Sequence, residues 1–151
     1  MSKLNVDQKN VKELFTGRTA NYLIPDYQRP YAWDEDECQT LWDDIFAFAF
    51  PDNNIDLFGS GDEYFLGTIV TYKNDNEQSE VIDGQQRLTT LLLLLRAFYD
   101  RFENMSDNHS KKMRTNIAQC IWKTDEFDVA DMKNLKIDSE VATDDEKEEF
   151  L

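Results

Sequence analysis

The sequence predicts an α+β fold, in which a small mixed sheet packs against helices. Two segments, residues 34–49 and 88–99, have the apolar content and spacing of helices. Short apolar runs bounded by turn residues, residues 64–72 and 80–83, are typical of strands. With 151 residues, of which 40% are hydrophobic, the chain is long enough to bury one core.

The N-terminal part is expected to form two helices and a short strand. Apolar residues recur at helical spacing over residues 11–15, and Gly17 ends that helix. Residues 22–24 then form a strand. The second helix begins after Asp34, whose side chain forms a capping box with Glu37.

This second helix is predicted to turn one apolar face to the core. Its apolar residues fall at i, i+3, i+4, i+7 and i+11. They are Cys38, Leu41, Trp42, Ile45 and Ala49. The periodicity assigns Trp42 to the core rather than to a ligand site.

The middle of the chain predicts a hairpin. Residues 64–72 are almost continuously apolar, which predicts a strand buried on both faces. Asn and Asp residues between positions 73 and 78 would turn the chain into the next strand, residues 80–83. Gly67 lies inside the longer strand, where glycine indicates either close approach of a ligand or of the Trp33 ring, or a simple bulge.

Five consecutive leucines at positions 91–95 surround the third helix with apolar side chains, which predicts that it is central and buried. A further amphipathic helix is expected over residues 110–122 and a short strand over 135–137. His109 is expected in a solvated loop.

The C-terminal end predicts a chain that continues. Thr143 and Glu146 form a capping-box pattern, yet the sequence stops after two helical turns, at Leu151. We therefore expect a core domain, residues 1–105, followed by a helical extension, residues 106–151, that begins a longer region.

Composition excludes several classes of protein. With 16 basic and 31 acidic residues the net charge is −15, which opposes non-specific binding to nucleic acid. Cys38 and Cys120 are far apart, which argues against a disulfide framework or a metal knuckle and favours a reducing cytoplasm. No apolar run approaches the roughly 20 residues of a membrane span, so no membrane partner is expected.

Residues 81–95 predict a strand, a glycine turn and the start of a helix. The turn places Asp83, Gln85, Gln86 and Arg87 beside the N–H groups of the first helical turn, which favour anions. The Arg87 guanidinium suits phosphate oxygens. The alternative is an Arg87 that pairs with a nearby carboxylate.

A second polar and aromatic segment spans residues 24–33. Its two prolines predict a stiff, extended chain. Tyr27, Tyr31 and Trp33 supply ring faces, while Gln28 and Arg29 supply donors beside them. Such a segment either binds a base or sugar or only covers the core.

Three ordered motifs carry a resemblance to a known family. They are Ile-Pro-x-Tyr-Gln-Arg-Pro-Tyr-x-Trp from Ile24, Tyr-Phe-Leu-Gly from Tyr64 and Asp-Gly-Gln-Gln-Arg-Leu-Thr-Thr-Leu from Asp83. Together they resemble the N-terminal domain of GmrSD-type restriction endonucleases. The resemblance implies a fold similar to the ParB and sulfiredoxin nucleotide-binding domains, in which a Gln/Pro-Arg segment and a Gly-x-x-Arg turn form one phosphate site.

Carried over to this sequence, the first segment matches at Ile24, Pro25, Gln28 and Arg29, and the turn matches at Gly84 and Arg87. Sulfiredoxins carry a reactive cysteine where this chain has Gln85, which excludes their chemistry. The further Arg- and Asn-containing motifs of ParB are not recognisable, which leaves the base and the metal ligands undefined. No P-loop motif occurs.

The function that the resemblance implies is a nucleoside triphosphate (NTP)-binding regulatory or sensor domain of a prokaryotic, modification-dependent restriction or phage-defence protein. NTP hydrolysis is left open, whereas nuclease activity is not expected because a nuclease needs metal ligands that this chain lacks. DNA would be reached only through a further C-terminal region or a partner.

The expected roles follow the chemistry of each side chain. Arg29 and Arg87 hold phosphates, Asp83 binds Mg²⁺ or orients a water, and Gln85 or Gln86 positions that water. The residues expected to contact the nucleotide are Gln28, Arg29, Tyr31, Trp33, Gly67, Gly84, Arg87 and Thr89. The alternative function is a non-catalytic module that recognises DNA or a protein through residues 27–33.

Overall fold

The computed structural model describes residues 5–16, 20–29, 31–57, 59, 61–127 and 129–140, without the side chains of 55 and 138. Helices and small sheets alternate along these residues, which confirms the α+β class. The predicted helix end at Gly17 and the capping pattern at Thr143 and Glu146 lie outside them.

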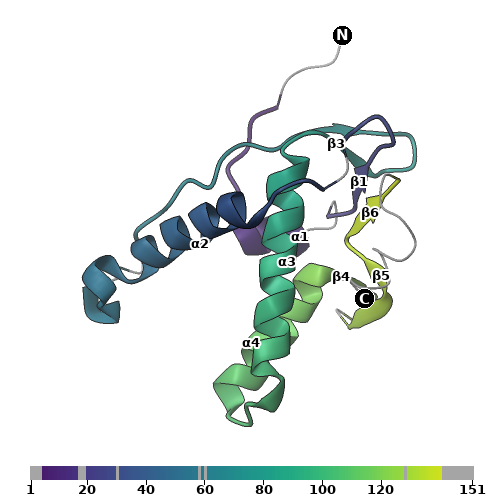
Figure 1. Ribbon diagram of the computed structural model, residues 1–151. Helices are drawn as coiled ribbons and strands as arrows, with labels where there is room; N and C mark the ends of the chain where they lie inside the picture. Colours follow the sequence, from purple (N-terminus) through teal and green to yellow (C-terminus); the bar gives the residue numbers. More distant parts are fainter. Residues whose placement is uncertain are drawn as a thin grey trace.

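The main sheet joins segments that are far apart in the sequence (Figure 1). Its strands are β1 (Tyr22–Ile24), β2 (Val70–Lys73), β3 (Ser79–Asp83) and β6 (Ile137–Ser139). In the described residues their order is β2-β3-β1-β6, with β1 parallel to β3 and to β6 and β2 antiparallel to β3. The predicted hairpin is therefore confirmed. The region after residue 105, expected to be helical, also supplies an edge strand of this sheet.

The strand predicted over residues 64–72 is wrong in its length and its burial. β2 begins only at Val70, and every residue in it is exposed. As an edge strand it pairs only with β3, whereas the preceding segment runs without regular structure. From that segment Leu66 and Ile69 pack against the core, while Phe65 is 76% exposed. The apolar run thus packs through individual side chains rather than through a pleated strand.

Helices make up most of the other regular structure of the described residues. They are α1 (Val11–Thr16), α2 (Glu35–Ala49), α3 (Gln85–Arg101) and α4 (Asn108–Ile121), with 3-10 helices η1 (Pro51–Asn53), η2 (Ile55–Leu57) and η3 (Phe102–Asn104). Strands β4 (Trp122–Thr124) and β5 (Ala130–Leu135) form a separate two-stranded sheet. Among these helices, none combines the length and apolar character that a membrane span needs. His109 is exposed in the first turn of α4 rather than in a loop.

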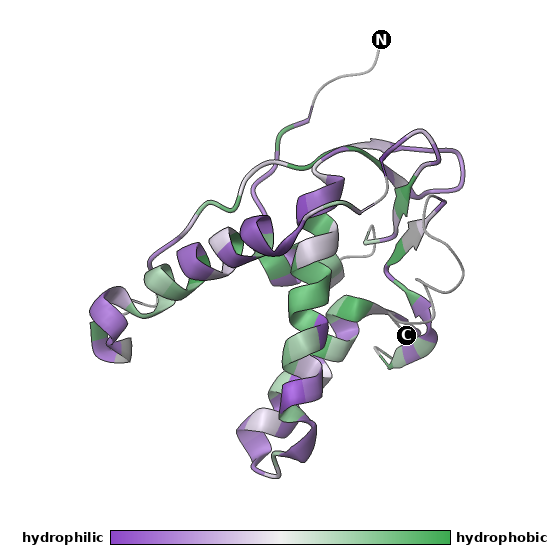
Figure 2. Ribbon diagram, in the orientation of Figure 1, coloured by the Kyte–Doolittle hydropathy of each residue, from purple (hydrophilic) through white to green (hydrophobic). Residues whose placement is uncertain are grey.

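The third helix is central, as predicted, and hydrophobic along its middle (Figure 2), but it is not buried all round. Leu88, Leu91 and Leu92 lie in the core, where α4 contributes Ile117. Leu93, one residue further on, is 37% exposed. The leucine run therefore has an outer side.

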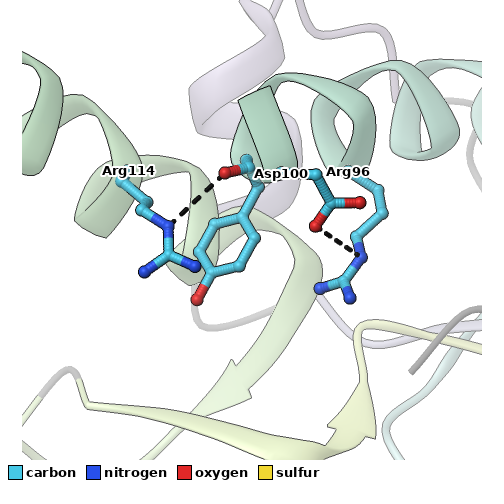
Figure 3. A network of polar contacts seen from close by, with 4 residues as sticks. Arg96, Asp100 and Arg114 are labelled. Carbon is cyan, nitrogen blue, oxygen red and sulfur yellow. Dashed lines mark hydrogen bonds and ion pairs between the residues drawn. The ribbon is translucent and has the colours of Figure 1, made fainter. Parts of the chain in front are cut away.

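A polar and aromatic network joins α3 to α4 (Figure 3). On α3, Arg96 pairs with Asp100 at 3.6 Å. From α4, Arg114 Nε donates to the Tyr99 carbonyl at 3.4 Å, and its guanidinium lies 4.0 Å from the Tyr99 ring centroid. The Arg96 guanidinium lies 5.0 Å from the centroid of the fully buried Trp122. This network therefore binds the C-terminal half of α3 to α4 and to β4.

Helix α2 departs most from expectation. Its capping box is present: the Asp34 carboxylate accepts from the N–H of Asp36 and Glu37, and Glu37 Oε2 accepts from the Asp34 N–H at 3.1 Å. Yet α2 contains no buried residue. Trp42 is 38% exposed, so the assignment of Trp42 to the core is wrong. The physical reason is the position of α2, which points away from the rest of the molecule (Figure 1).

Candidate functional site

A glycine turn joins β3 to α3. Gly84 is the N-cap of α3 at φ +92°, and a Cβ there would lie 2.9 Å from the Thr68 carbonyl oxygen. The first helical hydrogen bond runs from the Leu88 N–H to the Gly84 carbonyl at 2.9 Å. The N–H groups of residues 85–87 therefore point out of the helix end without intrahelical acceptors. The predicted strand–turn–helix is confirmed, and only glycine fits its corner without strain.

The segment of residues 24–33 contacts this turn through Gln28. Its Nε2 donates to the Val81 carbonyl at 3.2 Å and to the Ile82 carbonyl at 3.0 Å. Two motifs that are distant in sequence thus meet at the C-terminal end of β3. The next residue, Arg29, is exposed. That its guanidinium converges with that of Arg87 stays a prediction.

The same segment also binds the first turns of α3. The Ala32 N–H donates to Gln86 Oε1 at 2.7 Å. The Thr90 hydroxyl donates to the Gln86 carbonyl at 2.7 Å, so the Tyr31 hydroxyl, 2.8 Å away, donates to Thr90 Oγ1. Burial, together with a contact to Cys38, raises the pKa of Tyr31 to about 12, which keeps this donor protonated. Thr90 was not singled out from the sequence, although it lies one helical turn after Gln86.

Arg87 packs against a glycine instead of a carboxylate. Its Nη1 donates to the Thr68 carbonyl at 3.2 Å, and a Cβ on Gly67 would come within 2.5 Å of the guanidinium carbon. Gly67 itself has φ +122°. The close approach inferred for Gly67 is real, but the approaching group is Arg87. In the part of the chain that the structure describes, no carboxylate lies within 4.0 Å of Arg87.

The remaining predicted residues near the turn differ in how exposed they are. Gln85 is only 9% exposed, and no hydrogen bond links its side chain to the described residues. Among the described residues, the buried polar atoms without a partner lie on Asn21, Arg96 and Trp122 and not on Gln85, so the Gln85 amide remains accessible at the turn. Asp83 is exposed at the end of β3, where it pairs with Val70, and Thr89 and Trp33 are half-buried.

The carboxylates near the turn do not form a metal cage. Over the residues with described positions, no three His, Cys, Asp or Glu side chains lie together so that they could hold an ion. A magnesium ion at Asp83 would therefore take most of its ligands from phosphate oxygens and water. Mg²⁺ commonly binds proteins in this way.

Comparison with known proteins bears on the three motifs. The family model described as GmrSD restriction endonuclease, N-terminal domain, matches residues 11–150. The match spans all the motifs and every side chain placed at this site. No curated protein matches the sequence.

Proposed function

Since the chain belongs to the GmrSD restriction endonuclease N-terminal domain family, we propose that it is the nucleotide-binding regulatory domain of a cytoplasmic restriction or phage-defence protein. The proposed ligand is a nucleoside triphosphate with Mg²⁺, bound where β3 turns into α3. A fold of the ParB and sulfiredoxin type, in which this turn holds phosphate, is part of the proposal.

The arrangement of Arg87 is the observation that carries the proposal. Among the described residues it uses one of its five N–H donors, on the Thr68 carbonyl. The guanidinium is held beside the first turn of α3, where N–H groups without intrahelical acceptors and the helix dipole favour an anion. The amide of Gln85, which remains accessible, lies in the same turn. Preorganised donors of this kind suit phosphate oxygens.

Other residues supply the roles that a triphosphate needs. Arg29 adds a second positive charge to the phosphate site, and Tyr31 and Trp33 border the base or sugar. Asp83 carries the magnesium ion or orients a water. Because Gln86 Oε1 already accepts from the Ala32 N–H, Gln85 is the better candidate to position a water for hydrolysis. Bound Mg²⁺ would neutralise phosphate charge.

A thermal-shift screen tests the proposal. The purified chain is heated with ATP, GTP, CTP or UTP, with and without Mg²⁺, and at least one should raise Tm. Ligand at 100 times its Kd adds about 2.7 kcal/mol to the free energy of unfolding. Arg87→Ala should abolish the shift, and Arg87→Lys should restore only part of it, since an ammonium cannot make a bidentate contact.

Arg101→Ala is the matched control, because Arg101 is an exposed arginine in the last turn of the same helix. It should leave the shift unchanged. No shift with any triphosphate would contradict the proposal. An Arg87→Ala chain that is unfolded without ligand would instead assign Arg87 to the structural contact with Gly67 and Thr68.

A second candidate function is a protein- or DNA-interaction module. The Tyr27 side chain is 64% exposed, which favours this second function, because other residues of its segment contact the rest of the fold. Tyr27→Ser should then abolish partner capture without changing the nucleotide-dependent Tm.

A further inference from the structure

The chain between Arg29 and Lys73 contains no basic residue. Residues 30–72 hold ten carboxylates and no Lys, Arg or His. The acidic residues are Asp34, Glu35, Asp36, Glu37, Asp43, Asp44, Asp52, Asp56, Asp62 and Glu63. A stretch of 43 residues with a single sign of charge produces a local negative field beyond that of the whole chain.

Helix α2 carries half of these residues, and it also carries two aromatic side chains that stay exposed. All 15 of its residues are at least partly accessible, and Trp42 and Phe46 are each 38% exposed. In Figure 2, hydrophobic and hydrophilic residues alternate along this projecting helix. Exposed apolar side chains are informative where they adjoin one another and polar residues border them.

These aromatic rings form a continuous row. Along α2 and just after its last residue, the ring centroids of Trp42 and Phe46 are 6.0 Å apart, and those of Phe46 and Phe50 are 4.8 Å apart. Between α2 and α3, the ring centroids of Trp42 and Phe98 are 6.1 Å apart. The centroids of Phe98 and Phe102 are 6.5 Å apart. The row therefore joins the projecting helix to the side of α3.

Carboxylates border this row at a hollow. The hollow has a volume of about 460 Å³ and is lined by Trp42, Asp43, Phe46, Ala47, Phe50, Asp52 and Asn53. Three of its lining residues are aromatic, and aromatic side chains are common anchors at protein interfaces. The carboxylates of Asp43 and Asp52 stand beside them.

We propose that this acidic aromatic surface, formed by Trp42, Asp43, Phe46, Phe50 and Asp52, binds a basic amphipathic helix of a partner protein. An amphipathic helix presents apolar side chains at i, i+3, i+4 and i+7, which match a row of rings. Lys or Arg residues beside that stripe would meet the carboxylates, which raises the rate of association and excludes acidic partners. The same charges repel nucleic acid.

Fluorescence anisotropy with a synthetic probe tests the proposal. The probe is a labelled 20-residue helical peptide of Leu and Lys with an apolar stripe, and its comparator has the same composition in scrambled order. The amphipathic peptide should bind at least about tenfold more tightly. Phe46→Ser should remove that preference.

Two double variants separate a local surface from net charge alone. Asp43→Lys with Asp44→Lys should weaken binding at least about tenfold. Asp125→Lys with Glu126→Lys makes the same change in charge at exposed residues beside β4 and should have little effect. Because all four side chains are exposed, both variants should fold, which circular dichroism checks.

Three outcomes would overturn the proposal. Equal affinity for both peptides would show that net charge alone causes the binding. Equal losses of affinity in the two double variants would show the same. A wild-type dimer in sedimentation velocity that Phe46→Ser dissociates would show that a second copy of the chain covers the surface.

Discussion

Single residues decide whether the α3 turn can form. Gly67 and Gly84 both have positive φ, and at each of them a Cβ would lie closer than 3.0 Å to a neighbouring atom. The neighbours differ: Gly84 adjoins the Thr68 carbonyl, whereas Gly67 adjoins the Arg87 guanidinium. Gly84 therefore shapes the turn, and Gly67 sets where Arg87 lies.

Gly67→Ala should destabilise the fold and displace Arg87. The strained φ of an alanine at this position costs about 1–3 kcal/mol, and the new methyl group meets the guanidinium carbon at 2.5 Å. Urea denaturation measures the first effect, and loss of the triphosphate-dependent Tm shift measures the second. Gly61→Ala is the control, because nothing lies within 4 Å of its Cβ position. Equal stability of the two variants would contradict the contact.

Tyr22 should make stability depend on alkaline pH. Burial raises the pKa of Tyr22 to about 12, above its ordinary value of 10.0, and its hydroxyl donates to the Leu14 carbonyl at 2.7 Å. The folded state thus keeps a proton that the unfolded state releases. The contribution is complete below about pH 10 and is lost as pH rises to about 12, by at most about 1.4 kcal/mol per unit.

Denaturation curves between pH 9 and 12 check this dependence. Tyr22→Phe should lose about 1 kcal/mol at neutral pH with its hydrogen bond, yet its stability should fall less steeply above pH 10. Tyr72→Phe, at an exposed residue of β2, should keep the wild-type slope. A Tyr22→Phe slope equal to that of wild type would assign the alkaline loss to other groups.

At the scale of elements, the leucine run of α3 shows how tertiary contacts override local pattern. Leu92 is 1% exposed and Leu93 is 37% exposed, although the two have the same chemistry and adjacent positions. Leu92→Ala should cost about 2–5 kcal/mol through lost burial and a cavity. Leu93→Ala should cost far less. Urea midpoints compare the two, and similar losses would mean that α3 is enclosed on all sides.

Local sequence predicted helix α2 well, but it did not predict where α2 lies. The capping box of Asp34 and Glu37 depends on residues three positions apart, so the sequence alone was sufficient. Burial of the apolar face depends on a neighbour, and α2 meets the core in part, through Leu41 and through the contact of Trp42 with Phe98. Periodicity identifies an apolar face but not the surface that covers it.

At the scale of the molecule, charge limits what the chain can bind unaided. With a net charge of −15 and a 43-residue stretch without a basic residue, it should not load onto DNA at physiological salt. Incubated with Mg²⁺, triphosphate and modified or unmodified plasmid, the purified chain should therefore leave the plasmid intact on agarose gels. Cleavage that Asp83→Ala abolishes would contradict this and would place a nuclease centre at the α3 turn.

The sequence by itself determined the class of fold, most helices, strands β1 and β3, and the glycine turn, because caps, periodicity and turn residues act over a few positions. It also identified the family through three motifs. Only the tertiary structure decided that Gln28 binds the end of β3, that Gly67 admits Arg87, and that α2 stays exposed. These contacts join segments dozens of residues apart, and their partners depend on how the whole chain packs, which no local pattern encodes.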